Sequence, residues 1–394
     1  MNKELSSYAV RLRDLIANPQ SAIRNPQFSE LALELFAHQF KHNSAYRKLC
    51  EARGRTPQTV EHWTQIPAVP TAAFKEIELT SLALGERTAI FYSSGTTEQK
   101  PSRHFHSAES LAVYEASLFP WFLENILPDL GFAICDLRLV CLTPPPEQAP
   151  HSSLVHMFEV IRQKLDKSEC AFVGRIDTSG AWTLDFAATL AALSPQASSL
   201  KPRASLLLGT AFSFVHLLDE MVARDLRVEL PAGSCVMETG GYKNRSRSLP
   251  KEELHALITE RLGVPRENII CEYGMSELSS QAYDTEARGF GREALGSSAP
   301  RPAPNAPRLF HFPPWARVQI ISPETSREAG EGETGLIRIF DLANVFSVAA
   351  IQTEDLGILR GDGFELVGRA QLSEPRGCSL MSDSALRAPH SALK

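Results

Sequence analysis

The chain has 394 residues, a formal net charge of -6 from 40 basic and 46 acidic side chains, and seven cysteines with no C-x-x-C pair. Its length predicts two or three domains or subdomains, and the acidic balance argues against a nucleic-acid-binding surface. The scattered cysteines argue against a disulfide framework or a zinc ribbon and indicate a reducing, cytoplasmic location. No signal-peptide pattern begins the chain, and no apolar run reaches the ~18 residues that a membrane span needs.

The first 84 residues are predicted to be a helical segment packed on the core. Two stretches, 4–17 and 28–43, carry apolar residues at three- and four-residue spacing, which is typical of amphipathic helices. An extended connector with several prolines follows at 66–76.

Residues 85–299 show a different pattern and are predicted to form an α/β core. Short apolar runs that end in small or polar residues alternate with helical patterns. The runs are 88–95, 137–146, 204–211, 234–241 and 268–277, and the helical patterns are 153–165, 212–224 and 248–262. The last of these helices is expected to have Ser248 as its N-cap and Pro250 in its first turn. Strands that are apolar on both faces indicate a mostly parallel sheet with helices on both sides, and such sheets bind ligands beyond the carboxyl ends of their strands.

A small β-rich subdomain is predicted for residues 300–369. Four strand patterns with Gly and Asp turns follow the proline-rich segment 297–309, at 316–322, 335–342, 347–359 and 363–369. Their spacing predicts an antiparallel sheet or barrel. Residues 370–394 are too few for a further domain and are predicted to be a tail.

A cluster of hydroxyl and glycine residues follows the first apolar run of the core. It consists of Ser93, Ser94, Gly95, Thr96 and Thr97. Such residues form ordinary turns, but their backbone N–H groups and hydroxyls can also wrap the oxygens of a polyphosphate. Further on, His104 and His106 alternate along a strand pattern, and a surface pair is expected because no acidic or cysteine partner lies nearby in sequence.

Three further motifs follow in order along the chain. They are "YGMSE" at 273–277, "TEDLG" at 353–357 and "GR" at 368–369. In their order and spacing, the four motifs together resemble the adenylate-forming superfamily of acyl-CoA synthetases and peptide-synthetase adenylation domains. The resemblance covers roughly residues 85–370 and implies that ATP activates a carboxylate as an acyl-adenylate, with release of pyrophosphate.

The resemblance implies a role for each matching residue. Residues 93–97 would hold the β- and γ-phosphates, and Ser276 would meet the α-phosphate or the carboxylate. Tyr273 would stack on adenine, and Glu277 would hold Mg²⁺, an ion suited to carboxylate and phosphate oxygens. The remaining nucleotide-binding residues would be Gly240, Gly241, Gly274, Asp355 and Arg369, of which the last two would bind the ribose. Without the resemblance, the strand-end residues could be structural and Asp355 could cap a turn.

Two departures from the superfamily pattern narrow the choice of family within it. Glu98 replaces the usual glycine, with Pro and Lys reversed after it, so Lys100 is only a candidate phosphate contact. The superfamily's mobile C-terminal domain, which carries a catalytic lysine, is also lacking, since 25 residues follow Arg369 and their sole lysine is Lys394. Candidates to replace that lysine are Lys243, Arg245, Lys100 and Arg376.

These departures fit one branch of the superfamily. The stretches 66–75, 151–154, 239–243 and above all "GRAQLSEPRGCSL" at 368–380 resemble the LuxE-type acyl-protein synthetases. In that family a cysteine near the C-terminus accepts the acyl group, which then passes to a reductase. Cys378 stands at the matching place, and the nearby Arg376 could lower the pKa of its thiol, although Cys378 could also be an ordinary thiol.

The resemblance therefore implies an acid–thiol ligase that uses ATP and Mg²⁺. The substrate would be a carboxylic acid, most simply a fatty acid, and the partner an acyl reductase, an acyltransferase or a carrier protein. Two alternatives stay open. The acceptor could be an external thiol, of coenzyme A or a carrier protein, or the chain could be a non-catalytic nucleotide-binding subunit, which the missing lysine favours.

Overall fold

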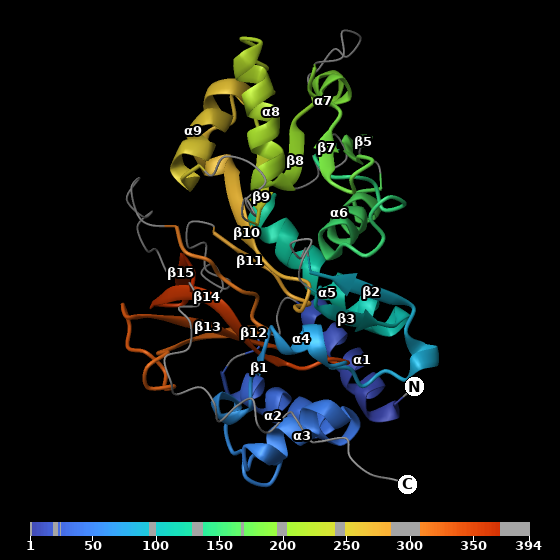
Figure 1. The fold of residues 1–394 in the computed structure, drawn as a ribbon, viewed down its shortest axis with the longest axis vertical. Helices are drawn as coiled ribbons and strands as arrows, with labels where there is room; N and C mark the ends of the chain where they lie inside the picture. Colours follow the sequence, from blue (N-terminus) through green and yellow to red (C-terminus); the bar gives the residue numbers. More distant parts are fainter. Residues whose placement is uncertain are drawn as a thin grey trace.

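The structure, a computed structural model, describes residues 2–18, 23, 25–93, 100–127, 137–166, 169–194, 203–240, 249–284 and 308–370. Its helices are α1 (Lys3–Ala17), α2 (Asn25–His42), α3 (Ser44–Ala52), α4 (Ala73–Glu76), α5 (Ala108–Ile126), α6 (Ser153–Lys164), α7 (Phe186–Leu193), α8 (Ala211–Ala223) and α9 (Lys251–Leu262). The helices predicted from the apolar spacing at 4–17 and 28–43 are confirmed as α1 and α2. In Figure 1, α2 and α3 lie at the bottom of the molecule, and α8 and α9 lie at the top.

A six-stranded sheet forms the centre of the α/β region. Its strands, in spatial order, are β11 (Ala282–Tyr283), β10 (Ile269–Tyr273), β9 (Cys235–Thr239), β8 (Ser205–Thr210), β4 (Arg138–Cys141) and β5 (Glu169–Phe172). All neighbours pair in parallel except β10 and β11, which are antiparallel. The predicted parallel sheet is therefore confirmed.

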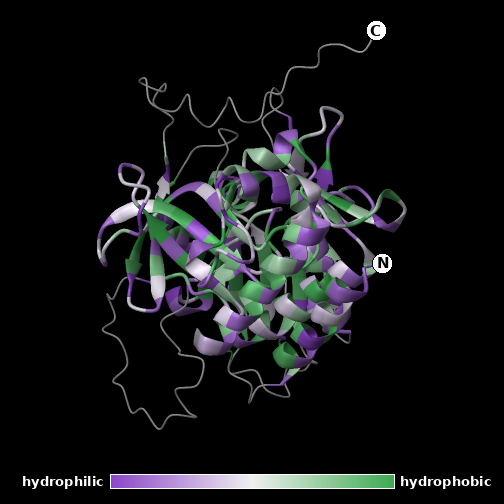
Figure 2. Ribbon diagram, turned by 90° about the horizontal axis from the view of Figure 1, so that it is seen from below, coloured by the Kyte–Doolittle hydropathy of each residue, from purple (hydrophilic) through white to green (hydrophobic). Residues whose placement is uncertain are grey.

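Helices cover both faces of this sheet, which explains why its strands are apolar on both sides. Leu206, Leu208 and Met237 belong to a core that includes α1, α2, α5 and α6. Their neighbours Leu207 and Val236 point to the opposite face and pack with α8 and α9. Burial of both faces favours continuous apolar runs over alternating ones. Hydrophobic residues, green in Figure 2, accordingly concentrate where the helices and strands pack in the middle of the molecule.

Two local predictions are wrong. The apolar run at 88–95 does not join the parallel sheet, because β2 (Ala89–Tyr92) forms an antiparallel hairpin with β3 (Arg103–His106). Only Phe91 of β2 is buried, and such a half-exposed strand suits a hairpin better than a sheet covered on both faces. In α9, Pro250 occupies the N-cap instead of the first turn, and Ser248 lies outside the described residues.

The second sheet is antiparallel, as predicted, with one addition. It contains β12 (Ala316–Ile321), β13 (Thr334–Asp341), β14 (Ala350–Arg360) and β15 (Gly363–Arg369). The addition is β1 (Val69–Pro70), which pairs in parallel with β14. A short hairpin, β6 (Gly174–Ile176) and β7 (Trp182–Leu184), completes the strands described.

The N-terminal helices and the second sheet are joined by direct contacts. In addition to the pairing of β1 with β14, Gln39 of α2 donates to the carbonyl oxygens of Asn344 and Val345. The predicted division of the chain after residues 84, 299 and 369 stays a prediction. Within the described ranges, no helix has both the length and the apolar character to cross a bilayer.

Candidate active site

The predicted site residues that the structure describes gather at the carboxyl ends of β9 and β10. These strands are adjacent and parallel, and Thr239 is the register partner of Glu272. Gly240 therefore follows β9 close to the place where Tyr273 ends β10. Outside the described residues lie Ser94, Gly95, Thr96, Thr97, Gly241 and Cys378, together with Lys243, Arg245 and Arg376.

The turn at residues 274–281, here called the Glu277 turn, carries the candidate metal ligand. The carboxylate of Glu277 is 5% exposed. It accepts hydrogen bonds from the hydroxyls of Ser102, at 2.5 Å, and Ser276, at 3.0 Å. The structure thus brings the two predicted residues of this motif into contact and adds Ser102, which sequence reasoning did not select.

The backbone of the Glu277 turn is held from two sides. His104 lies with its Nδ1 2.7 Å from the carbonyl oxygen of Ser276, and Asn344 donates its Nδ2 to the carbonyl oxygen of Glu277 at 2.9 Å. Asp341 accepts from the backbone N–H of Ser279. Since these bonds join the turn both to β3 and to the segment 341–344, the Glu277 carboxylate is preorganised before any ligand binds.

The first predicted phosphate-loop residue lies next to this turn. Ser93 and Ser102 face each other where β2 ends and β3 begins, so the segment between them connects the two strands of the hairpin. The Ser93 N–H donates to the Ser102 carbonyl oxygen at 3.2 Å, and the Ser102 N–H donates to Ser93 Oγ at 2.9 Å. Lys100, the candidate phosphate contact, lies with its Nζ 3.7 Å from Glu76.

The predicted nucleoside-binding residues also meet. The Tyr273 hydroxyl donates to Asp355 Oδ2 at 2.9 Å, and Arg369 Nε lies 4.0 Å from Asp355 Oδ1. Burial raises the pKa of Asp355 above its ordinary value. The ring of Tyr273 packs edge-on against three phenylalanines, Phe310, Phe312 and Phe364. Tyr273, Asp355 and Arg369 therefore form a second group of site residues, which we call the Asp355 edge.

The two described glycines of the site have different surroundings. Gly240 has a φ of +71°, and a Cβ built on it would meet no atom within 4 Å, so this position is both left-handed and open. A Cβ on Gly274, by contrast, would collide with the Glu272 carboxylate. That carboxylate accepts from the Thr239 hydroxyl, and burial raises its pKa to about 7.

The two alternating histidines are not a surface pair, so that prediction is wrong. His104 is 3% exposed and His106 is 1% exposed, and their rings lie 4.3 Å apart. Burial lowers the pKa of His104 to about 4 and the pKa of His106 well below its ordinary value, so both are neutral at physiological pH. Alternation along the strand correctly put them on one face, but it does not reveal that α5 and the Glu277 turn cover that face.

The Glu277 carboxylate suits a divalent cation held together with phosphates. Among the described residues it meets only serine hydroxyls and no basic side chain, although a buried carboxylate needs a compensating positive charge. The described residues contain no group of three or more His, Cys, Asp or Glu side chains placed to hold a metal ion. One carboxylate is nevertheless sufficient for Mg²⁺, which commonly takes its other ligands from substrate phosphates and water.

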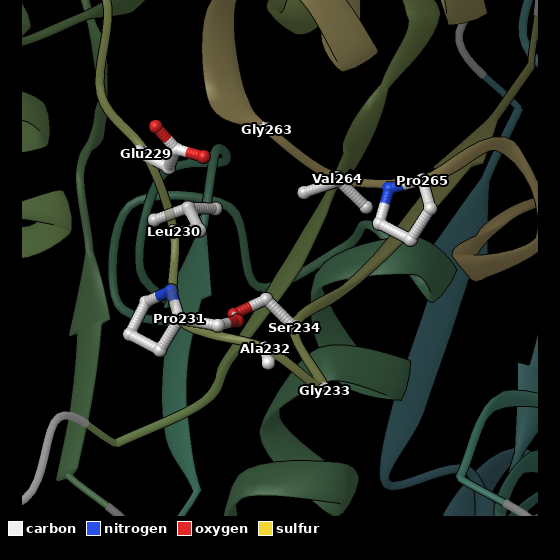
Figure 3. A pocket seen from close by; sticks show the side chains of 9 residues that line it. All are labelled: Glu229, Leu230, Pro231, Ala232, Gly233, Ser234, Gly263, Val264 and Pro265. Atoms are coloured by element: carbon white, nitrogen blue, oxygen red, sulfur yellow. The ribbon is translucent and has the colours of Figure 1, made fainter.

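A pocket at the opposite end of the sheet does not contain this chemistry. It is lined by the loop 229–234 before β9 and by residues 263–265 after α9 (Figure 3). Glu229 is its only ionisable side chain, and apart from the Ser234 hydroxyl the lining is otherwise aliphatic or backbone. In parallel sheets ligands bind at the carboxyl ends of the strands, and this pocket lies at the amino end of β9.

Comparison with curated proteins finds two relatives that match almost the whole chain. A long-chain-fatty-acid–luciferin-component ligase of Vibrio harveyi is 24% identical over 377 residues, which cover 91% of this chain and 88% of the relative. A ligase of the same name from Aliivibrio fischeri is 23% identical over 372 residues, covering 89% and 86%. No family model matches the chain.

Comparison with solved structures identifies the fold. A 2-hydroxyisobutyryl-CoA ligase in complex with 2-HIB-AMP and CoA superposes with a TM-score of 0.61 at 13% identity, over 89% of this chain and 75% of the ligase. The postadenylation state of that ligase gives a TM-score of 0.61 at 14% identity, over 89% and 68%. The chain spans about half the length of ATP-bound MatB from Rhodopseudomonas palustris, with 15% identity, 73% and 49% coverage and a TM-score of 0.45. The comparisons agree with the resemblance of the motifs: the chain is similar over most of its length to the long-chain-fatty-acid–luciferin-component ligases, the LuxE type, and has the fold of the adenylate-forming enzymes.

Proposed function

We propose that the protein uses ATP to activate a carboxylic acid, first of all a long-chain fatty acid, and transfers the acyl group to the thiol of Cys378. The observation that carries the proposal is the buried Glu277 carboxylate, which two hydroxyls orient beside the start of the predicted phosphate loop. The names of the two relatives support a fatty acid as substrate. The acyl-AMP compound bound to the similar CoA ligase supports an adenylate as intermediate.

The first step is the attack of a substrate carboxylate oxygen on the α-phosphorus of ATP, which breaks the bond to pyrophosphate. Catalysis of such a transfer depends on positioning and on charge stabilisation. Ser93 and residues 94–97 would hold the leaving phosphates, and Ser276 would lie next to the α-phosphate. Asp355 would accept hydrogen bonds from the ribose hydroxyls. Mg²⁺, held by Glu277, would neutralise the charge on the phosphates.

The second step is the attack of the Cys378 thiolate on the carbonyl carbon of the adenylate. The bond between that carbon and the AMP oxygen breaks, AMP leaves, and the resulting thioester keeps the acyl group activated. An acyl reductase, an acyltransferase or a carrier protein would then take the acyl group. The basis for proposing such a partner is the name of the two relatives, which are ligases of a fatty acid and a luciferin component.

Intact-protein mass spectrometry tests the proposal directly. The protein is incubated with ATP, Mg²⁺ and a panel of fatty and aromatic acids, and is then treated with hydroxylamine. We expect a hydroxylamine-labile mass gain on Cys378. Cys378→Ser should abolish the thioester but keep ATP–pyrophosphate exchange within about twofold of wild type, because adenylate formation does not use the thiol. The matched control is Cys170→Ser, which removes a thiol that is only partly buried. This variant should still be acylated on Cys378.

Two other results would replace the proposal. If AMP and pyrophosphate form only after coenzyme A or a carrier protein is added, the acceptor is an external thiol, as the CoA bound to the similar ligase would suggest. Absence of ATP–pyrophosphate exchange with every acid would instead indicate a non-catalytic nucleotide-binding subunit.

A further inference from the structure

The β2–β3 hairpin has a polar base that contacts the Glu277 turn. Ser102, the last residue before β3, is 1% exposed and forms four hydrogen bonds. Its N–H and carbonyl oxygen bond to Ser93 across the hairpin, and its hydroxyl donates to Glu277 Oε1 and lies 3.5 Å from Ser276 Oγ. Ser102 therefore links the start of the predicted phosphate loop to the candidate metal ligand, 175 residues further along the chain.

His104 makes a second contact between the same two segments. It lies two residues after Ser102 on the same strand, and its Nδ1 is 2.7 Å from the Ser276 carbonyl oxygen. Because a carbonyl oxygen only accepts hydrogen bonds, the Nδ1 atom carries the proton. With one bond to the side chain of Glu277 and one to the backbone of Ser276, the strand fixes both the position and the orientation of the turn.

We propose that Ser102 and His104 are positioning residues that hold the Glu277 carboxylate in the orientation in which it binds a divalent cation. This inference rests on the proposed function, in which Glu277 would hold the Mg²⁺ that accompanies ATP. Neither residue needs to touch the nucleotide. Hydrogen bonds to a metal-binding carboxylate typically change metal affinity by ~10–100-fold when they are removed.

The structure provides matched controls for both residues. Ser234 is as buried as Ser102 and its hydroxyl also forms two hydrogen bonds, but it lies at the amino end of β9. His106 is on the same strand as His104 and equally buried, but its Nδ1 contacts Ser110 instead of the Glu277 turn. Ser234→Ala and His106→Leu therefore remove comparable groups without touching the turn.

The test is binding of Mn²⁺ in the presence of a non-hydrolysable ATP analogue, measured by electron paramagnetic resonance of the free ion. This readout does not depend on turnover. We expect Ser102→Ala and His104→Leu to weaken Mn²⁺ binding by about tenfold or more, and the two control variants to bind within about twofold of wild type. His104→Asn, which keeps a donor at the Nδ1 position, should restore most of the affinity, whereas His104→Gln should not.

A double variant tests the route of the effect. If Ser102 acts through the carboxylate, adding Ser102→Ala to Glu277→Gln should cause no further loss of Mn²⁺ binding. Additive losses would overturn the inference, as would normal binding in Ser102→Ala and His104→Gln, or equal losses in the control variants. A wild-type protein that does not bind Mn²⁺ with the analogue would overturn the proposed function itself, and this inference with it.

Discussion

The two halves of the candidate site are built differently. The Glu277 turn is enclosed, and hydrogen bonds from β3 and from the segment after β13 fix its carboxylate and its backbone. The Asp355 edge joins Tyr273 at the end of β10 to β14 and the edge strand β15 of the second sheet, where the Arg369 side chain is 72% exposed and its Nε stays 4.0 Å from Asp355. The chain is thus rigid where charge has to be oriented and open where a nucleoside would enter and leave.

The sharpest test of this contrast is Glu277→Gln. The amide keeps the shape of the side chain and can accept from one serine hydroxyl and donate to the other, but it removes the charge that would hold Mg²⁺. We expect ATP–pyrophosphate exchange to fall about 100- to 1,000-fold with little change in circular dichroism or melting temperature. Exchange within threefold of wild type would show that the enclosed half is only structural.

The enclosed half should also carry a pH dependence of stability. Burial raises the pKa of Glu272 from 4.5 to about 7, so the folded state holds a proton that the unfolded state releases between these values. Stability from this group is therefore present below pH 4.5 and is lost as the pH rises to 7, by an amount on the order of 3 kcal/mol. We expect urea unfolding to show that the free energy of unfolding of Glu272→Gln, relative to that of the wild type, increases from pH 4.5 to pH 7. The buried His104 acts in the opposite sense, because its pKa is lowered to about 4, but it is common to both proteins and cancels in the difference. If the difference in the free energy of unfolding between the two proteins does not change with pH, Glu272 does not have the raised pKa.

The smallest effect is expected at the open edge. Arg369→Ala removes an exposed partner, and such ion pairs contribute ~1 kcal/mol or less. We expect KM for ATP to rise about threefold with kcat unchanged. Asp355→Ala should raise KM more, because it also leaves the buried Tyr273 hydroxyl without an acceptor. If Arg369→Ala and Glu277→Gln reduced ATP–pyrophosphate exchange equally, the distinction between the two halves of the site would be wrong.

The sequence was sufficient for features that depend on local periodicity and on motif order. Continuous apolar runs correctly predicted β4, β8, β9 and β10, and the order of the motifs correctly predicted the family relationship. In the candidate site, Ser276 contacts Glu277 and Asp355 contacts Arg369, but the roles of these residues stay predictions.

Most of the failures concern contacts between segments that the pattern of one segment does not contain. Alternation showed that His104 and His106 share a face, but not that α5 and the Glu277 turn would bury it. The run at 88–95 was assigned to the wrong sheet because a hairpin partner could not be distinguished from a parallel one. Ser102 was missed for the same reason, since its significance comes from Glu277. Only its position directly after the glycine- and hydroxyl-rich segment was visible in the sequence.

The long-range pairing between the N-terminal region and the second sheet has a consequence for synthesis of the chain. Gln39 bonds to Asn344, which lies 305 positions later, and β1 can pair with β14 only after β14 has been synthesised. At ribosomal speeds of about 5–20 residues per second, α2 would emerge roughly 15–60 s before Asn344 exists. During that time the part of α2 that packs against the later segment lacks native cover, which is the condition under which nascent chains aggregate or recruit chaperones. The Glu277 turn, which depends on residue 344, would become complete only when nearly all of the described chain has been made.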